Sequence, residues 1–156
     1  MTVFVLFKYL HILTMFAAVA AAMIPEVVLH AVARRGDVAA VRGLVPVVSA
    51  VGRLIPILFM VGLVFGLIAA VTGELDLLRP WLVASYVVFA IAMATGVLLS
   101  GPWAKGVADA ALASPTDAYS PELEQAVHDR RGLVSTAILM TAIAVIVFLM
   151  VAQPGG

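Results

Sequence analysis

The chain has 156 residues, of which 64% are hydrophobic and 12% charged, and its mean hydropathy is +1.17. A soluble domain of this size needs far more polar side chains to cover its surface, so the composition indicates an integral membrane protein. The formal net charge is zero and no basic stripe is present, which argues against a nucleic-acid partner. The absence of cysteine excludes disulfide bonds, thiolate metal sites and a cysteine nucleophile.

Four apolar stretches follow one another along the chain. They run over residues 3–33, 44–71, 81–100 and 132–152. Each has at least the roughly 20 residues that an α-helix needs to cross about 30 Å of hydrocarbon. Backbone groups within lipid must be hydrogen-bonded internally, so these stretches are expected to be helices rather than strands. The sequence therefore predicts an all-α fold, a single four-helix transmembrane bundle over residues 1–156.

The segment in front of the fourth stretch has residues that are typical of a helix start. Ser120 suits the N-cap and Pro121 the first helical position, and acidic residues follow at 122 and 124. We therefore expect the fourth helix to run over 121–152 and to bend at Gly132, where it enters the membrane.

Basic residues are unevenly distributed between the two sides of the predicted bundle. The connections at 34–43 and 100–132 each hold three of them, whereas the other side holds only Lys8 and Arg79. The positive-inside rule places the two basic connections in the cytoplasm and both termini outside. No basic segment precedes the first apolar stretch, so we expect a retained helix rather than a secretory signal. The predicted location is the cytoplasmic (inner) membrane.

Glu26 and Arg53 are charged residues inside the first two apolar stretches. By helical rise, Glu26 lies roughly 12 Å from Arg34, and Arg53 lies roughly 16 Å from Arg42. Opposite charges at similar depth on adjacent helices favour an ion pair, because charged groups in a membrane usually face the bundle and find a partner. The pair would be either a clamp between helices or part of a polar pocket or ion path. The alternative is that the two side chains reach separately toward the headgroups.

Three histidines are the remaining candidate ligands. His11 lies in the outer half of the first helix, where an imidazole either ligates haem iron or bonds a neighbouring carbonyl or hydroxyl. Met150 is the methionine at the most similar depth, so a b-type haem with His11 and Met150 as ligands is one hypothesis. His30, His128 and Asp129 would form a polar cluster on the cytoplasmic side. We predict no metal site there.

Gly62 and Gly66 form a GxxxG motif in the second apolar stretch. Such spacing lets another helix approach closely, either within the bundle or across a homodimer. The chain has no phosphate-binding loop, HExxH or GxSxG motif, and so no recognisable catalytic centre.

The segments FKYLHIL (7–13) and RPWLVASYVVFAIAMATGVLLSGPW (79–103), with the four-helix layout, resemble a bacterial membrane family known as domain of unknown function 2269. That resemblance implies a four-helix membrane fold without an assigned activity. FKYLHIL followed by VLHAVARRGD (28–37) also resembles the CopD-like membrane proteins and the HemJ-type protoporphyrinogen oxidases. In the latter, the histidine that matches His11 would be a haem ligand. The chain departs from that pattern, because Glu26 lies where an arginine is expected.

These observations predict a small membrane protein without its own catalytic centre, an accessory or assembly subunit of a membrane complex. Its partners would be the lipid bilayer and other membrane subunits. The first alternative is a protein that binds b-type haem or another small ligand through His11. Further alternatives are an enzyme like protoporphyrinogen oxidase and a carrier that uses the Glu26 and Arg53 region.

Overall fold

The computed structural model describes residues 2–115 and 118–154, and the regular elements in these ranges are all helical. Their bounds are α1 (Val3–Ala33), α2 (Val38–Thr72), α3 (Pro80–Thr95), the π turn η1 (Gly96–Ser100), α4 (Gly101–Ala113), α5 (Pro121–Val127) and α6 (Arg130–Ala152). The elements α3, η1 and α4 follow one another without a gap and make one rod. The prediction of an all-α fold is confirmed.

Four helical segments are long and apolar enough to cross a membrane, as predicted. They are α1, α2, the α3–η1–α4 rod and the α5–α6 pair. Their lengths of 31 to 35 residues correspond to about 46 to 52 Å of helix, which exceeds the roughly 30 Å of hydrocarbon in a bilayer. Each segment therefore extends past the apolar layer.

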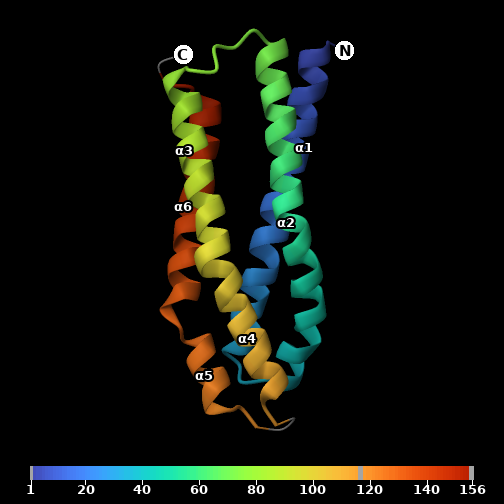
Figure 1. Cartoon of the computed structure of the whole chain (residues 1–156), viewed down its shortest axis with the longest axis vertical. Helices are drawn as coiled ribbons and strands as arrows, with labels where there is room; N and C mark the ends of the chain where they lie inside the picture. Colours follow the sequence, from blue (N-terminus) through green and yellow to red (C-terminus); the bar gives the residue numbers. More distant parts are fainter. Residues whose placement is uncertain (1, 116–117, 155–156) are drawn as a thin grey trace.

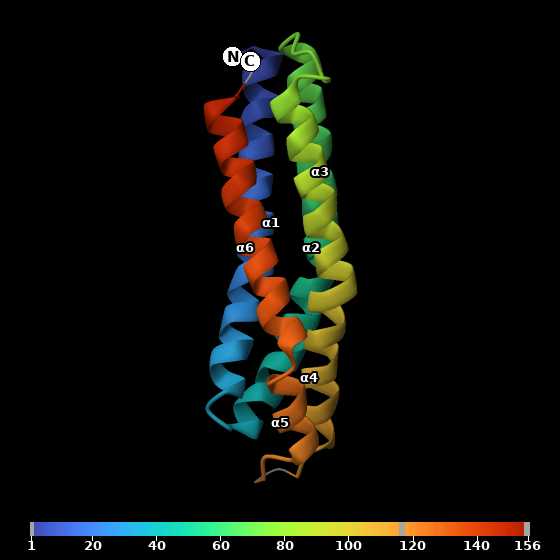
Figure 2. The same ribbon diagram turned by 90° about the vertical axis from the view of Figure 1, so that its left-hand side faces the viewer.

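The helices associate as two pairs, α1 with α2 and α3 with α6 (Figure 1). In Figure 2 the α3–α6 pair lies in front of the α1–α2 pair. The N- and C-terminal ends of the chain lie together with residues 73–79, and we call this the terminal end of the molecule (Figure 1). Residues 34–37, 114–115 and 118–120 lie at the opposite end, which we call the arginine end (Figure 1). The two basic connections thus share one end of the bundle.

The turn between α1 and α2 is tighter than the sequence suggests. The α2 helix begins at Val38, six residues before the predicted start at residue 44. Asp37 is its N-cap, since the carboxylate accepts a hydrogen bond of 2.9 Å from the backbone N–H of Ala40. Gly36 precedes it with a φ of +73°, a left-handed conformation that glycine adopts without steric cost. Because only residues 34–37 separate the two helices, α2 begins before the apolar stretch that starts at residue 44.

The third helix does not end at residue 100 as predicted, but continues through α4 to Ala113. Pro102 has no backbone N–H and would normally break the helix. Here the π turn accommodates it, with the N–H of Gly101 donating to the carbonyl of Gly96, five residues back. The helix therefore keeps its direction and extends past the membrane.

The fourth segment is interrupted earlier than predicted, at His128 and Asp129 rather than at Gly132. Asp129 is the N-cap of α6 and accepts a hydrogen bond of 2.9 Å from the N–H of Arg131. At the start of α5, the Ser120 hydroxyl accepts a hydrogen bond from Leu123 N–H at 3.2 Å. Asp129, a second capping residue after Ser120, thus divides the segment 121–152 that the sequence predicted as one helix.

The buried apolar side chains gather mostly at the arginine end. This cluster draws on α1, α2, α4 and α5 and comprises Leu29, Ala33, Val38, Val41, Trp103, Val107, Ala111, Leu123 and Val127. A smaller cluster of Trp81, Leu82 and Leu149 lies between α3 and α6 at the terminal end. The two helix pairs are therefore joined chiefly at the arginine end.

Two polar side chains join the helix pairs at the arginine end by capping helix C-termini. The guanidinium of Arg42 in α2 donates to the carbonyls of Ala111, at 2.7 Å, of Leu112, at 3.3 Å, and of Ser114. The hydroxyl of Tyr119 donates to the carbonyl of Ala33 at 2.8 Å. The last carbonyls of a helix have no partner within the helix, so these bonds satisfy the ends of α4 and α1.

Candidate functional site

Glu26 is the one buried ionisable side chain among the described residues, with 8% of its surface exposed. It lies in α1, directly after Pro25. Helical rise places it about 34 Å from Val3, slightly more than the thickness of the hydrocarbon layer. A bilayer that begins near the terminal end therefore places this carboxylate at the membrane edge nearer the arginine end.

Three hydroxyl groups from two other elements converge on the Glu26 carboxylate. Thr136 and Ser135 of α6 lie 2.6 Å and 3.4 Å from its Oε1 atom. Ser100, the last residue of η1, donates to Oε2 at 3.1 Å. One carboxylate thus connects α1 to both members of the second helix pair. We call Glu26, Ser100, Ser135 and Thr136 the Glu26 cluster.

The two hydroxyls of α6 in this cluster also reach a backbone oxygen. The carbonyl of Gly132 lies 3.0 Å from the Ser135 hydroxyl and 2.8 Å from the Thr136 hydroxyl. Serine and threonine in helices commonly donate to a carbonyl three or four residues earlier. Each hydroxyl therefore has two oxygen neighbours, Oε1 of Glu26 and the carbonyl of Gly132, but only one proton to donate.

An aromatic layer lies one helical turn from the Glu26 cluster, toward the arginine end. His30, four residues after Glu26, stacks on Trp103 with ring centroids 4.1 Å apart and an interplanar angle of 19°. Trp103 is 3% exposed, and its indole N–H donates to the carbonyl of Ala126. A Cβ atom at Gly132 would lie 2.6 Å from the Trp103 ring, so the indole occupies the space that this glycine leaves free. The layer therefore lies next to the cluster on that side.

The structure does not bring Glu26 and Arg53 together, and this corrects the ion pair expected from the sequence. The Arg53 side chain is exposed, and its Nε donates to the carbonyl of Ser49 on its own helix at 3.3 Å. Within the ranges 2–115 and 118–154, the ion pairs join Lys105 to Asp109 and Arg131 to Asp129. Equal depth on adjacent helices is not sufficient for contact, because the two side chains must also face each other.

His11 lies against the two glycines of the GxxxG motif. Its Nδ1 atom donates to the carbonyl of Gly62 at 2.7 Å, and a Cβ atom at Gly66 would lie 2.7 Å from the same nitrogen. Met15 packs on Gly62 one turn further along. The motif therefore serves the packing of α1 on α2. Met150 instead packs on the Trp81, Leu82 and Leu149 cluster, so the two expected haem ligands lie in different surroundings.

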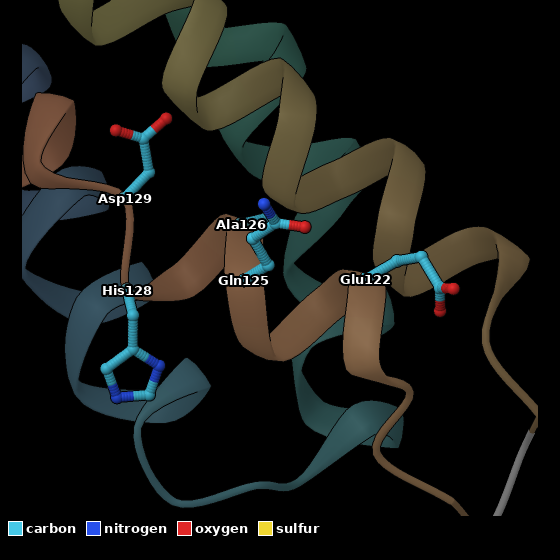
Figure 3. A pocket seen from close by; sticks show the side chains of 5 residues that line it. All are labelled: Glu122, Gln125, Ala126, His128 and Asp129. Atoms are coloured by element: carbon cyan, nitrogen blue, oxygen red, sulfur yellow. The ribbon is translucent and has the colours of Figure 1, made fainter.

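The expected cluster of His30, His128 and Asp129 is divided between two places. His30 belongs to the aromatic layer, whereas His128 and Asp129 line a shallow hollow with Glu122, Gln125 and Ala126 (Figure 3). The His128 ring and the Asp129 carboxylate point in different directions there (Figure 3). The Nδ1 atom of His128 is bonded to the carbonyl of Glu124 at 2.9 Å. In the described part of the chain, no three acidic or histidine side chains gather to hold a metal ion.

Burial raises the pKa of Tyr119 above its ordinary value near 10, and the nearby negative charge of Glu124 adds to the effect. Both causes disfavour the phenolate, since it would be poorly solvated and would face a like charge. The neutral hydroxyl is the form that donates to the carbonyl of Ala33. Tyr119 therefore stabilises the arginine end in its protonated form.

The sequence did not indicate Ser100, Ser135 and Thr136 as partners of Glu26. Each is an ordinary small polar residue in an apolar stretch, and their separation from Glu26 by 74 to 110 positions hides the contact. One signal was present, because Ser135 and Thr136 lie at the arginine side of the fourth stretch, as Glu26 does in the first. Matching such depths across helices identifies candidate partners.

Comparison with known proteins agrees with the fold. No curated protein and no solved structure matches this chain. One family model, described as a predicted integral membrane protein, matches residues 5–154 and so covers nearly the whole chain. The likeness to the CopD-like and HemJ-type proteins remains a prediction. With four apolar helices that can span a membrane, this chain belongs to the DUF2269 family of predicted integral membrane proteins.

Proposed function

We propose that this chain is an accessory subunit of a membrane complex. Within it, the Glu26 cluster takes up and releases a cation at the edge of the bilayer. A proton is the simplest such cation. The observation that carries the proposal is the convergence of three hydroxyls on one buried carboxylate, without a cationic side chain bonded to it in residues 2–115 and 118–154.

The charge of this carboxylate is the reason to assign it a function. An ionised carboxylate removed from water without a positive partner is costly, so buried charges are normally paired. Glu26 has hydrogen-bond donors but no paired charge among the ion pairs of the described residues. Ionisable residues in such positions are functional candidates by default. A transiently bound cation supplies the missing charge.

The position of the cluster favours an accessory role over a carrier. Secondary transporters bind substrate near the bilayer midplane, where the site can face either side in turn. The Glu26 cluster lies instead about 34 Å from Val3, near one edge of the apolar layer. We place the arginine end in the cytoplasm by the positive-inside rule, with both termini outside and the chain in the bacterial inner membrane. The cluster would then exchange its cation with the cytoplasmic side.

Carbodiimide labelling tests whether Glu26 takes up a proton. Dicyclohexylcarbodiimide is apolar and reacts with protonated carboxyl groups, and mass spectrometry of the labelled protein locates the adduct. In lipid nanodiscs we expect labelling of Glu26 that increases as the pH is lowered, and no adduct at this position in Glu26→Gln. Exposed Glu122 serves as the internal control, because water quickly hydrolyses the O-acylisourea formed there, which releases dicyclohexylurea and regenerates the carboxyl group. A Glu26 that stays unlabelled at every pH would contradict the proposal.

Gentle extraction from the native membrane tests the accessory role. The proposal expects the chain in a larger assembly that loses its integrity when this chain is deleted. A complex that assembles and works equally well without it would count against the role. Glu26→Gln in the same strain separates a structural role of the chain from the cation-binding role of Glu26, because a purely structural subunit tolerates this neutral and nearly isosteric change.

Haem binding through His11 is the second candidate, and one observation favours it. The Nδ1 atom of His11 is bonded to the carbonyl of Gly62, and ligating histidines typically use such a bond to fix the ring and leave Nε2 for the iron. An absorption spectrum of the purified protein tests this hypothesis. A Soret band that disappears in His11→Ala supports it, whereas a colourless and fully folded preparation excludes it.

A further inference from the structure

We propose that the Glu26 cluster binds one monovalent metal cation, sodium, in competition with the proton; the proposal rests on the cation-binding function of the same cluster. The site consists of the Glu26 carboxylate, the hydroxyls of Ser100, Ser135 and Thr136, and the carbonyl of Gly132. These oxygens come from α1, η1 and α6, so a cation among them would also join the two helix pairs.

A count of protons in the cluster points to an additional positive charge. Four close oxygen–oxygen contacts join Ser135 and Thr136 to Gly132 and Glu26, at distances between 2.6 and 3.4 Å. Two hydroxyl protons are available for these four contacts. Whichever contacts these two protons occupy, two of the four oxygen–oxygen contacts are left without a hydrogen between them. A cation among the oxygens offsets this deficit.

The identity of the donor atoms selects a hard cation. All of the groups are oxygens, whereas transition metals favour imidazole or thiolate ligands. The formal charge of the set is that of a single carboxylate, since hydroxyls and carbonyls are neutral. Calcium sites in proteins usually combine several carboxylates with neutral oxygens. One negative charge surrounded by neutral oxygens matches a monovalent ion.

The backbone around Ser100 is irregular in the manner of membrane ion sites. Irregular or unwound helix segments expose backbone carbonyls, which coordinate sodium or protons in transporters. The π turn Gly96–Ser100 precedes Pro102, and a proline leaves a carbonyl on the preceding turn without its helical donor. π turns within α-helices are frequent at functional sites. This turn ends on the residue that donates to Oε2 of Glu26.

The aromatic layer of His30 and Trp103 lies between the Glu26 cluster and the arginine end. Trp103 in this layer is almost fully buried. A sodium ion that enters from that side passes this layer and loses most of its hydration shell. The oxygens of the cluster replace the lost water, which is the general basis of ion recognition in membrane proteins.

Protection from carbodiimide tests the proposal on the wild-type protein. Labelling of Glu26 in nanodiscs is followed at one acidic pH in choline chloride, and sodium chloride then replaces choline at constant ionic strength. At a sodium concentration ten times its dissociation constant, we expect the labelling rate to fall about tenfold, because only the unoccupied fraction reacts. Choline, which is too large for the cluster, gives no protection.

Two substitutions on α6 link protection to the hydroxyls. Thr136→Val removes the hydroxyl closest to Glu26 and should weaken sodium protection, while Glu26 is still labelled in choline. Thr141→Val removes an exposed hydroxyl of the same helix and should leave protection unchanged. Labelling that depends on pH but is unaffected by sodium would overturn the sodium site and leave the proton-binding function intact. Failure of Glu26 to be labelled at any pH would overturn both.

Discussion

The hydroxyl oxygen of Thr136 lies 2.6 Å from Oε1 of Glu26, across 110 positions of the sequence. This contact joins the first helix to the last, and Ser100 joins the same carboxylate to the third rod. One charged residue thus bonds the first helix to both members of the second helix pair. Its partners are neutral hydroxyls, and no ion pair of the described residues balances its charge, which is the ground for the proposed cation.

Removing the Thr136 hydroxyl should destabilise the protein. Thr136→Val keeps the shape of the side chain and removes its hydrogen bond with Glu26, so we expect a loss of about 1 kcal/mol of unfolding free energy, as interhelical bonds in membranes give about 0.6 to 1.7. Titration with a denaturing detergent measures it. Thr141→Val, at an exposed position of the same helix, is the control and should cost much less. Equal losses in the two variants would argue against the contact.

Arg53 and Glu26 should be energetically independent. Arg53 is exposed and bonded within its own helix, so Arg53→Met should have the same effect in wild-type protein as in Glu26→Gln. A double-mutant cycle measured by detergent titration should give an interaction energy below about 0.5 kcal/mol, the range found for residues that do not touch. A coupling of several times that size would restore the ion pair and refute the present geometry.

Two glycine substitutions should have opposite effects. Gly132→Ala places a methyl group 2.6 Å from the Trp103 ring and should destabilise the protein, although alanine is the better helix former. Gly106→Ala, in α4, meets no atom within 4 Å and should stabilise it by up to about 1 kcal/mol. Thermal unfolding in detergent compares them. If Gly132→Ala were stabilising as well, the packing of Trp103 on α6 would be wrong.

Arg42 should not be replaceable by lysine. Its planar guanidinium serves several carbonyls at the end of α4, whereas a lysine ammonium is a compact charge with a different geometry. Arg42→Met should cost about 1.5 to 3 kcal/mol, the range for hydrogen bonds that involve charged groups, and Arg42→Lys should recover only part of it. Arg35→Met, at an exposed position nearby, is the matched control. Full rescue by lysine would show that charge alone matters.

Tyr119 should make the protein sensitive to alkaline pH. Burial, with a smaller contribution from Glu124, raises its pKa in the folded state above the unfolded value near 10. Its contribution is therefore complete below that value and is lost as the pH rises through the folded pKa. The thermal midpoint should fall over this window in wild type, and the fall should be smaller in Tyr119→Phe. Tyr9→Phe, at an exposed tyrosine, should behave as wild type.

The fold was largely predictable, because lipid imposes strong and simple demands on a sequence. Length and hydropathy indicated four helices, and the first was placed at residues 3–33, as the structure has it. The ends were harder to predict wherever a helix continued into water. The α4 helix and residues 38–43 of α2 lie outside the apolar stretches, where capping by Asp37 and the π turn before Pro102 determine the boundary. Hydropathy does not register either feature.

The candidate site was only partly predictable. Glu26 was identified because a carboxylate in an apolar helix is expensive wherever it lies. Its partners were not identified, because the sequence shows how deep a residue lies along a helix but not the direction of its side chain, which depends on how the helices pack. Arg53 has a similar depth and faces outward, whereas three small hydroxyls without a distinctive signal face Glu26.

The most direct test of a cation-responsive Glu26 is an infrared difference spectrum of the protein in nanodiscs, compared with Glu26→Gln. On lowering the pH without sodium, we expect the carbonyl band of one protonated carboxyl group that is missing in the variant. Addition of sodium at the same pH should reduce this band and restore the carboxylate bands. Spectra of wild type and Glu26→Gln that change identically with pH and with sodium would contradict the assignment of Glu26 as a cation site.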